Sequence, residues 1–381
     1  MDNASGSGSL LVPASGPGMV ASRRSISTRW AASARQRRIC SSRCAPRLER
    51  APSPRPRRLG AVLLHRSLRG CACAPRVHAI PLQWGLGCLD LIYAHQGTTI
   101  FRLVNSAPPT RASYFASGWT GYESAAASIL KLQHASVWQG VIDVGELTSE
   151  VATWKDVDGR VRKVGMPPSM SIAAFREKVR TLHFTNGSDQ GLVAALYETM
   201  ITAALGGAEL LRFASAGWSD AEAASFAESL ALCTRLNVLY LGHNAFGSAG
   251  LAAVARPLGE GAAPQLQRLY LDRNDFSDGD EGVRVLGRAQ MPALKVLWMN
   301  DTRFRLSALV EGMHQDAWPS LKELRMNNNK EAFSDEGAEA LARALERGAM
   351  PKLKTVWARG CSAAGSAAIK KARPGVQVMS R

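Results

Sequence analysis

Between residues 179 and 358 the sequence repeats one apolar pattern: a hydrophobic residue, two variable residues, a hydrophobic residue, one variable residue and a third hydrophobic residue. The pattern occurs seven times, and its first positions are Val179, Ala208, Leu236, Leu266, Leu294, Leu321 and Leu353. These positions are 29, 28, 30, 28, 27 and 32 residues apart. A regular period of this length predicts a solenoid, in which each unit buries its apolar face against its neighbours.

Each unit is predicted to contain a strand, a turn and a helix. The position three residues after the pattern holds Asn244, Asn274 and Asn329, whose side chains can hydrogen-bond the backbone of the adjacent turn. Other units have Gly187, Ala216, Thr302 and Cys361 there, so this Asn ladder is incomplete. An aromatic residue two positions further on is expected to pack beneath the turn: Trp218, Phe246, Phe276 or Phe304. Apolar spacing then predicts helices over residues 220–232, 248–258, 280–289, 306–314 and 335–345.

The pattern resembles the leucine-rich repeats of the ribonuclease-inhibitor type, whose units alternate a β-strand with an α-helix. The resemblance covers about residues 170–381, from Val179-x-x-Leu182-x-Phe184 to the units that follow. It implies an α/β leucine-rich-repeat solenoid, or horseshoe, of about seven strand–helix units, and residues 374–378 are expected to form a short closing strand. Because the family includes inhibitors, GTPase activators, immune receptors and scaffolds, the resemblance predicts the fold more sharply than the function.

The charge of the chain is concentrated at its N-terminus. The net charge is +16, and residues 1–80 contain 15 Arg, no Lys and two acidic residues. This Arg-, Ser- and Pro-rich composition predicts a disordered leader over residues 1–100. Residues 20–38 have the composition of a transit peptide. A solvated basic tail, or non-coding sequence translated by an incorrect gene model, would have the same composition.

A small mixed module is predicted between the leader and the repeats, over residues 101–168. The run 137–144 favours a strand, and Asp158-Gly159 between two β-rich segments predicts a β-hairpin. Residues 169–381 are then expected to form the leucine-rich-repeat domain. Cysteine use supports a reducing compartment, since only Cys233 and Cys361 lie beyond residue 88. The cytoplasm is therefore expected, or a mitochondrion or plastid if the leader is a transit peptide.

One side chain per unit is predicted to point to the concave face of the solenoid, because side chains alternate along a strand. These residues are His183, Arg212, Tyr240, Tyr270, Trp298, Arg325 and Trp357, and just beyond one strand lie Asp272 and Arg273. Exposed Tyr, Trp and Arg are typical of protein-binding hot spots. The alternative is that aromatic residues stand there for strand propensity and packing alone. We favour binding over packing alone, which predicts an unidentified protein or peptide partner on this face.

No enzyme signature is present in the sequence. There is no Gly-Lys pair, which excludes a Walker phosphate loop, and neither a His-Glu-x-x-His nor a Gly-x-Ser-x-Gly motif occurs. The Cys and His spacings match no zinc pattern, so no metal, cofactor or small-molecule substrate is expected. A non-enzymatic interaction scaffold is the predicted function. Nucleic-acid binding is disfavoured because the excess charge lies in the leader, and no apolar run is long enough to span a membrane.

The alternative function is a GTPase-activating regulator similar to the Ran-activating leucine-rich-repeat proteins. Those activators act through Arg, Asn or Asp residues at a strand-to-loop edge and typically continue into an acidic tail. Residues 370–381 are basic in this chain, which counts against the alternative.

Overall fold

The computed structural model describes residues 93–94, 98–102, 104, 113–130, 141–143, 168–329 and 332–380. All of them lie in one compact unit of the chain, Cys73–Arg381. The expected hairpin at Asp158-Gly159 and most of the expected leader lie outside the described residues.

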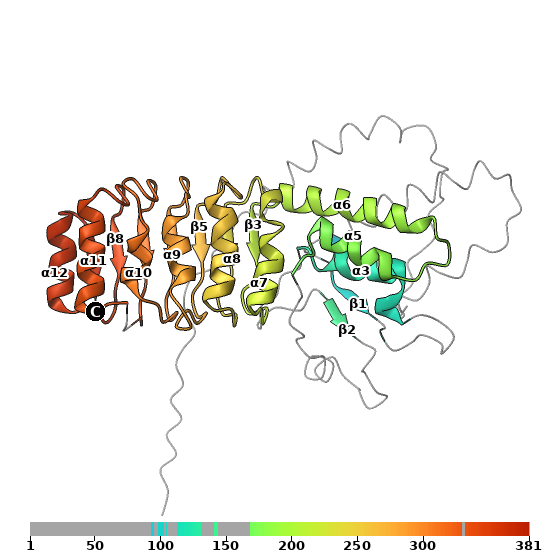
Figure 1. The fold of residues 1–381 in the computed structure, drawn as a ribbon, viewed down its shortest axis with the longest axis horizontal. Coiled ribbons are helices and arrows are strands. Elements are labelled where there is room, and N and C mark those ends of the chain that lie inside the picture. Colours follow the sequence, from blue (N-terminus) through green and yellow to red (C-terminus); the bar gives the residue numbers. More distant parts are fainter. Residues whose placement is uncertain are drawn as a thin grey trace, which may run out of the picture. The chain divides into compact units, whose positions relative to one another are not determined.

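Seven parallel strands form one sheet, and their spatial order is their order in the chain (Figure 1). The strands are β3 (Leu210–Arg212), β4 (Val238–Tyr240), β5 (Arg268–Tyr270), β6 (Val296–Trp298), β7 (Glu323–Arg325), β8 (Thr355–Trp357) and β9 (Gln377–Met379). Corresponding residues pair across every step: Leu239, for example, lies between Leu211 and Leu269. This register keeps each position of the repeat in one straight row across the sheet.

A helix follows each strand from β3 to β8, as the repeat pattern predicts. These helices are α7 (Asp220–Ala227, followed by η3, Leu230–Leu232), α8 (Ser248–Gly259), α9 (Glu281–Arg288), α10 (Leu306–Glu311), α11 (Asp335–Glu346) and α12 (Ala363–Ala372). Successive helices pack against one another along the stack in Figure 1. Ser219, Ser334 and Ser362 cap the starts of α7, α11 and α12 with their side-chain oxygens.

The core lies between the sheet and the helices. The central residues Leu239, Leu269 and Leu297 are 0% exposed, and the aromatic residues beneath the turns are buried as well: Trp218, Phe246, Phe276 and Phe304. Burial of one such leucine contributes about 1.5–3 kcal/mol, so the stacking of units supplies the stability that an isolated unit lacks. The predicted α/β leucine-rich-repeat solenoid is confirmed.

The first predicted unit is wrong in detail. Val179 lies in α5 (Ile172–Thr181), and His183 forms only an isolated bridge with Ser117. The first two apolar residues of the repeat pattern are three apart, a spacing that also fits one face of a helix, and Val179 is buried on such a face together with Phe175. The seventh strand is instead β9, close to the closing strand expected at residues 374–378.

A helical cluster precedes β3 in the chain. It contains η2 (Tyr114–Ala116), α3 (Gly118–Ala127), α5 and α6 (Asp189–Gly207), and α6 packs against both α3 and α5. At its centre the rings of Phe175 and Tyr197 stack with centroids 3.8 Å apart. Tyr197 donates its hydroxyl hydrogen to the Met170 carbonyl at 2.8 Å, and burial raises the pKa of this tyrosine.

Two short strands belong to the segment before α5. β1 (Ile100–Arg102) pairs in parallel with β2 (Val141–Asp143), which lies within the β-favouring run at residues 137–144. Ala94 is part of the buried core, ahead of the boundary expected at residue 100. None of the helices in the described part of the chain is long and apolar enough to cross a membrane.

Candidate functional site

Six of the side chains predicted to line the concave face form one continuous stack. We call this set the aromatic–arginine column: Arg212, Tyr240, Tyr270, Trp298, Arg325 and Trp357. Each member is the last residue of its strand, so the register places all six in one row on the same face of the sheet, which we call the open face. His183 is not part of the column, because its segment does not join the sheet.

Successive members of the column contact one another through their flat groups. The Arg212 guanidinium lies 4.6 Å from the Tyr240 ring centroid, and the rings of Tyr240 and Tyr270 stack at 4.3 Å with 9° between their planes. Trp298 meets Tyr270 edge-on at 4.6 Å. The Arg325 guanidinium lies between two indoles, 4.2 Å from Trp298 and 4.7 Å from Trp357. Such contacts stabilise an aromatic or cation–π pair by about 0.5–1.5 kcal/mol, so the column is rigid before any partner binds.

Tyr270 is more buried than the sequence predicts. Its side chain is 8% exposed, because Tyr240 covers one side and Trp298 the other. Burial raises the pKa of the Tyr270 hydroxyl, and the proximity of Tyr240 raises it further. The accessible members of the column are therefore its half-buried residues, and Tyr270 acts mainly as their support.

Three nitrogen donors in the column have no hydrogen-bond partner among the described residues. They are Arg212 Nε, Trp298 Nε1 and Trp357 Nε1, each enclosed by neighbouring atoms. An unsatisfied buried donor costs about 1–3 kcal/mol.

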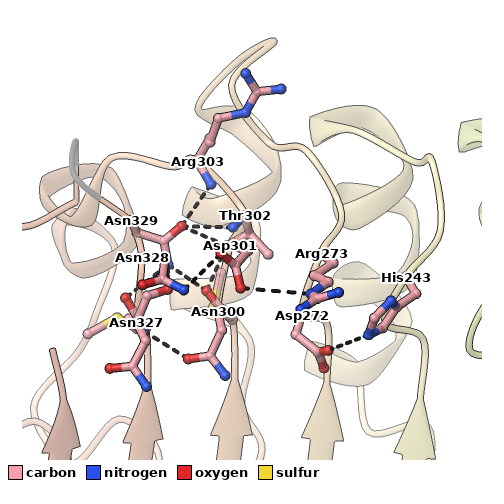
Figure 2. Close-up of polar contacts among 12 residues, drawn as sticks. His243, Asp272, Arg273, Asn300, Asp301, Thr302, Arg303, Asn327, Asn328 and Asn329 are labelled. Atoms are coloured by element: carbon pink, nitrogen blue, oxygen red, sulfur yellow. Dashed lines mark hydrogen bonds and ion pairs between the residues drawn. The ribbon is translucent and has the colours of Figure 1, made fainter. Parts of the chain in front are cut away.

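The loops that follow the strands form a second row of polar contacts (Figure 2). His243 Nε2 lies 3.4 Å from Asp272 Oδ2, and Asn328 donates to Asp301 Oδ1 at 3.0 Å. Arg273 Nε lies 3.9 Å from the other oxygen of Asp301. The structure thus brings the predicted residues Asp272 and Arg273 to the carboxyl edge of the sheet beside the column.

The backbone of this edge repeats as regularly as the strands. The third residue after each strand from β3 to β7 adopts a positive φ between 54° and 62°: Ser215, His243, Arg273, Asp301 and Asn328. His243 donates its backbone N–H to the Asp272 carbonyl at 2.7 Å, and Arg273 donates to the Asn300 carbonyl at 2.9 Å. These bonds extend the pairing of the strands into the loops, which offsets the cost of the left-handed conformation.

The surroundings of Asp272 raise the pKa of its carboxylate. Burial raises the pKa of Asp272, and the nearby His243 and Arg273 oppose that rise. Its side chain is 22% exposed, compared with 39% for Asp301. The favourable contacts of the Asp272 carboxylate with His243 and Arg273 therefore do not fully offset the cost of removing its charge from water.

Asn244, Asn274 and Asn329 are buried beneath the loops and bond to the backbone of adjacent units. Asn329 accepts the backbone N–H groups of Thr302 and Arg303, each at 2.8 Å, as Figure 2 shows. Asn244 accepts from two N–H groups of the preceding loop in the same way. Asn274 donates to two carbonyls, but its side-chain oxygen has no partner in the part of the chain that the structure describes.

A third row lies at the opposite edge of the sheet and was not among the predicted site residues. It consists of the residues just before each strand, including Asn237, Gln267, Lys295, Lys322 and Lys354. Lys322 donates its backbone N–H to the Lys295 carbonyl at 2.8 Å, and Lys354 donates to the Lys322 carbonyl at 2.9 Å. The sequence does contain a signal for this row, because three consecutive units have a lysine at the first variable position of the repeat pattern.

A cavity of about 340 Å³ lies on the helical side, beside α10. Arg284, Arg305 and Arg343 line it, and each is paired with a carboxylate: Arg305 with Asp280, Arg284 with Asp280 and Glu311, and Arg343 with Glu339. Its charges thus largely compensate one another. No cluster of three or more His, Cys, Asp or Glu able to hold a metal ion occurs in the described ranges.

Comparison with known families identifies two segments of the chain. Residues 232–255 and 319–342 match the family model described as Leucine Rich repeat. The first match runs from the end of η3 through β4 into α8, and the second covers β7 and the start of α11. A comparison with curated proteins finds no match. These two segments are thus leucine-rich repeats, in agreement with the solenoid that the strands and helices form, and repeats of this kind indicate a role in protein–protein interaction.

Proposed function

We propose that the protein is a non-enzymatic scaffold that binds a protein or peptide partner on the open face of the sheet, which corresponds to the concave face of the solenoid. The observation that carries this proposal is the preformed aromatic–arginine column. Large aromatic and Arg side chains dominate binding energy at protein interfaces. A column already fixed by its own stacking loses little conformational entropy when a partner binds.

The composition of the column supports the proposal further. Strand propensity explains why aromatic residues are tolerated in the row, but it does not explain why Arg325 alternates with two tryptophans. Partner binding accounts for this alternation.

The proposal also includes the type of repeat and the compartment. Strands β3 to β8 begin 27–32 residues apart and alternate with α-helices, which supports the ribonuclease-inhibitor type. Cys233 and Cys361 carry free thiols, which suits the cytoplasm. A mitochondrial or plastid location stays the alternative, since the transit-peptide prediction concerns residues outside the described ranges.

An affinity capture from native lysate tests the proposed function. The full chain is compared with a Tyr240→Ala/Trp298→Ala/Trp357→Ala variant, and Phe115→Ala serves as a control because Phe115 is an exposed aromatic residue outside the sheet. We expect partners that bind the wild type and the control but are lost with the triple variant. Equal recovery by all three folded proteins would contradict binding through the column.

The GTPase-activating alternative rests on Arg273, whose side chain is 63% exposed at the carboxyl edge of the sheet. An exposed Arg near the nucleotide can stabilise the charge that develops during phosphoryl transfer. The test is single-turnover GTP hydrolysis by Ran with the full chain and with Arg273→Ala. Acceleration that disappears in the variant favours the alternative, and no acceleration by the wild-type chain contradicts it for this GTPase.

A further inference from the structure

The row before strands β6, β7 and β8 carries three consecutive cations. Lys322 and Lys354 are exposed, while Lys295 donates from Nζ to Gln267 Oε1 at 2.8 Å. None of the three forms an ion pair among the described residues. Their backbones are hydrogen-bonded in sequence, so successive lysines stand one strand apart, about 4.8 Å. We call these three residues the lysine row.

The lysine row and the aromatic–arginine column lie at opposite ends of the same three strands. Lys295 immediately precedes β6 and Trp298 is its last residue, which corresponds to a separation of about 10 Å along the strand. Glu323 lies between the two rows on β7, and its carboxylate is paired with Arg325. The part of the sheet formed by β6, β7 and β8 thus has a strip of lysines without an ion pair among the described residues at one edge, and a strip of indole and guanidinium groups at the other end of the strands.

The spacing of the lysine row favours a helix over an extended peptide. Side chains on one face of an α-helix recur about every 5.4 Å along its axis, whereas alternate side chains of a strand recur about every 6.8 Å. Over the two steps of the lysine row, the side chains of a helix laid across the strands move out of register with the lysines by about 1.2 Å, whereas those of an extended peptide move out of register by about 4 Å. The diameter of a helix, about 10–12 Å, also matches the separation of the two strips.

We propose that this end of the open face binds an acidic amphipathic helix of a partner protein. Its carboxylates lie over the lysine row, and its apolar side chains contact Trp298 and Trp357. This inference rests on the proposed function, because it assumes that the open face binds a protein, and it adds the chemistry of the bound segment. The row of cations and the neighbouring apolar strip together select for one acidic and one apolar stripe on the helix.

A single-stranded nucleic acid also pairs charge with stacking, but the column suits it less well. Bases stack on free aromatic faces. The facing surfaces of Tyr240 and Tyr270 are occupied by each other, and Arg325 covers one face of Trp298. Few ring faces are left for bases, whereas a helix needs only the ring edges and the cations.

A peptide-display selection on the full chain tests the inference. A random library of helix-compatible peptides is selected on the wild type, and the affinity of the enriched peptides is then measured by fluorescence anisotropy. The variants are Lys322→Glu/Lys354→Glu and, as a control with the same number of changes, Lys370→Glu/Lys371→Glu on α12. Thermal melts establish that both variants are folded.

We expect the enriched peptides to carry Asp or Glu every three to four residues beside an apolar stripe. Their affinity should fall at least tenfold in Lys322→Glu/Lys354→Glu, stay within about twofold in the control, and decrease as salt is raised. Neutral or basic enriched peptides, acidic peptides that bind both variants equally, no enrichment, or tighter binding of oligo(dT) than of any peptide would each overturn the inference.

The two proposals fail in different ways. If lysate partners are lost with the triple aromatic variant but retained by Lys322→Glu/Lys354→Glu, the proposed function stands and the acidic helix is excluded. If partners are lost with neither variant, the open face does not bind through the column and both proposals fail.

Discussion

The buried asparagines beneath the loops differ in how many hydrogen bonds they satisfy. Asn329 bonds to two N–H groups and two nearby carbonyls, whereas Asn274 donates to two carbonyls and leaves its oxygen unpaired within the described ranges. We therefore expect Asn329→Ala to lower the free energy of unfolding by about 2–3 kcal/mol and Asn274→Ala by about 1 kcal/mol. Urea denaturation followed by circular dichroism measures both, and equal losses would contradict this ranking.

Asp272 gives a prediction about pH. Burial raises its pKa above the ordinary 3.8, so the folded state holds this proton more tightly than the unfolded state does. The stability of the wild type should therefore decline as pH rises from 3.8 through the higher folded value. We expect Asp272→Asn to raise Tm by about 1–2 °C at pH 7, with the gain disappearing near pH 3.8. Asp301→Asn is the comparison, and a lower Tm for Asp272→Asn at pH 7 would show that the contact with His243 dominates.

Two adjacent residues of β5 give a prediction about which face of the strand is buried. Leu269 is 0% exposed at the centre of the sheet, while Arg268 is exposed on the same strand. Leu269→Asp buries a charge without a partner and should lower stability by more than about 4 kcal/mol or abolish cooperative unfolding. Arg268→Asp should change it by less than about 1 kcal/mol. Thermal melts compare the two, and equal destabilisation would contradict the assignment of Leu269 to the buried face and Arg268 to the exposed face.

The whole molecule gives a prediction about its N-terminal part. The described residues all lie in the compact unit Cys73–Arg381, and Ala94 is in its core. Deletion of residues 1–72 is expected to leave Tm within about 2 °C, whereas deletion of residues 1–100 should lower it because Ala94 and the start of β1 are removed. Calorimetry of the three chains checks this, and equal Tm values for the two deletions would mean that Ala94 contributes nothing.

The sequence by itself determined the period, the phase of the strands and the positions of most helices. The period and the phase follow from residues such as Leu239, Leu269 and Leu297, because one apolar pattern decides which side chains are buried. The helix positions follow from the residues of each turn, which decide where the next helix begins. It also placed six column residues on one face of the sheet, since alternation along a strand is a local property.

Only the tertiary structure decided the rest. Val179 fits a strand and a helix equally well by spacing, and its packing beside Phe175 selects the helix. Tyr270 is buried because rings from neighbouring units close over it, and Lys295, Lys322 and Lys354 become a row because the register aligns them. These features depend on contacts between units about 30 residues apart in the chain, which no pattern within one unit specifies.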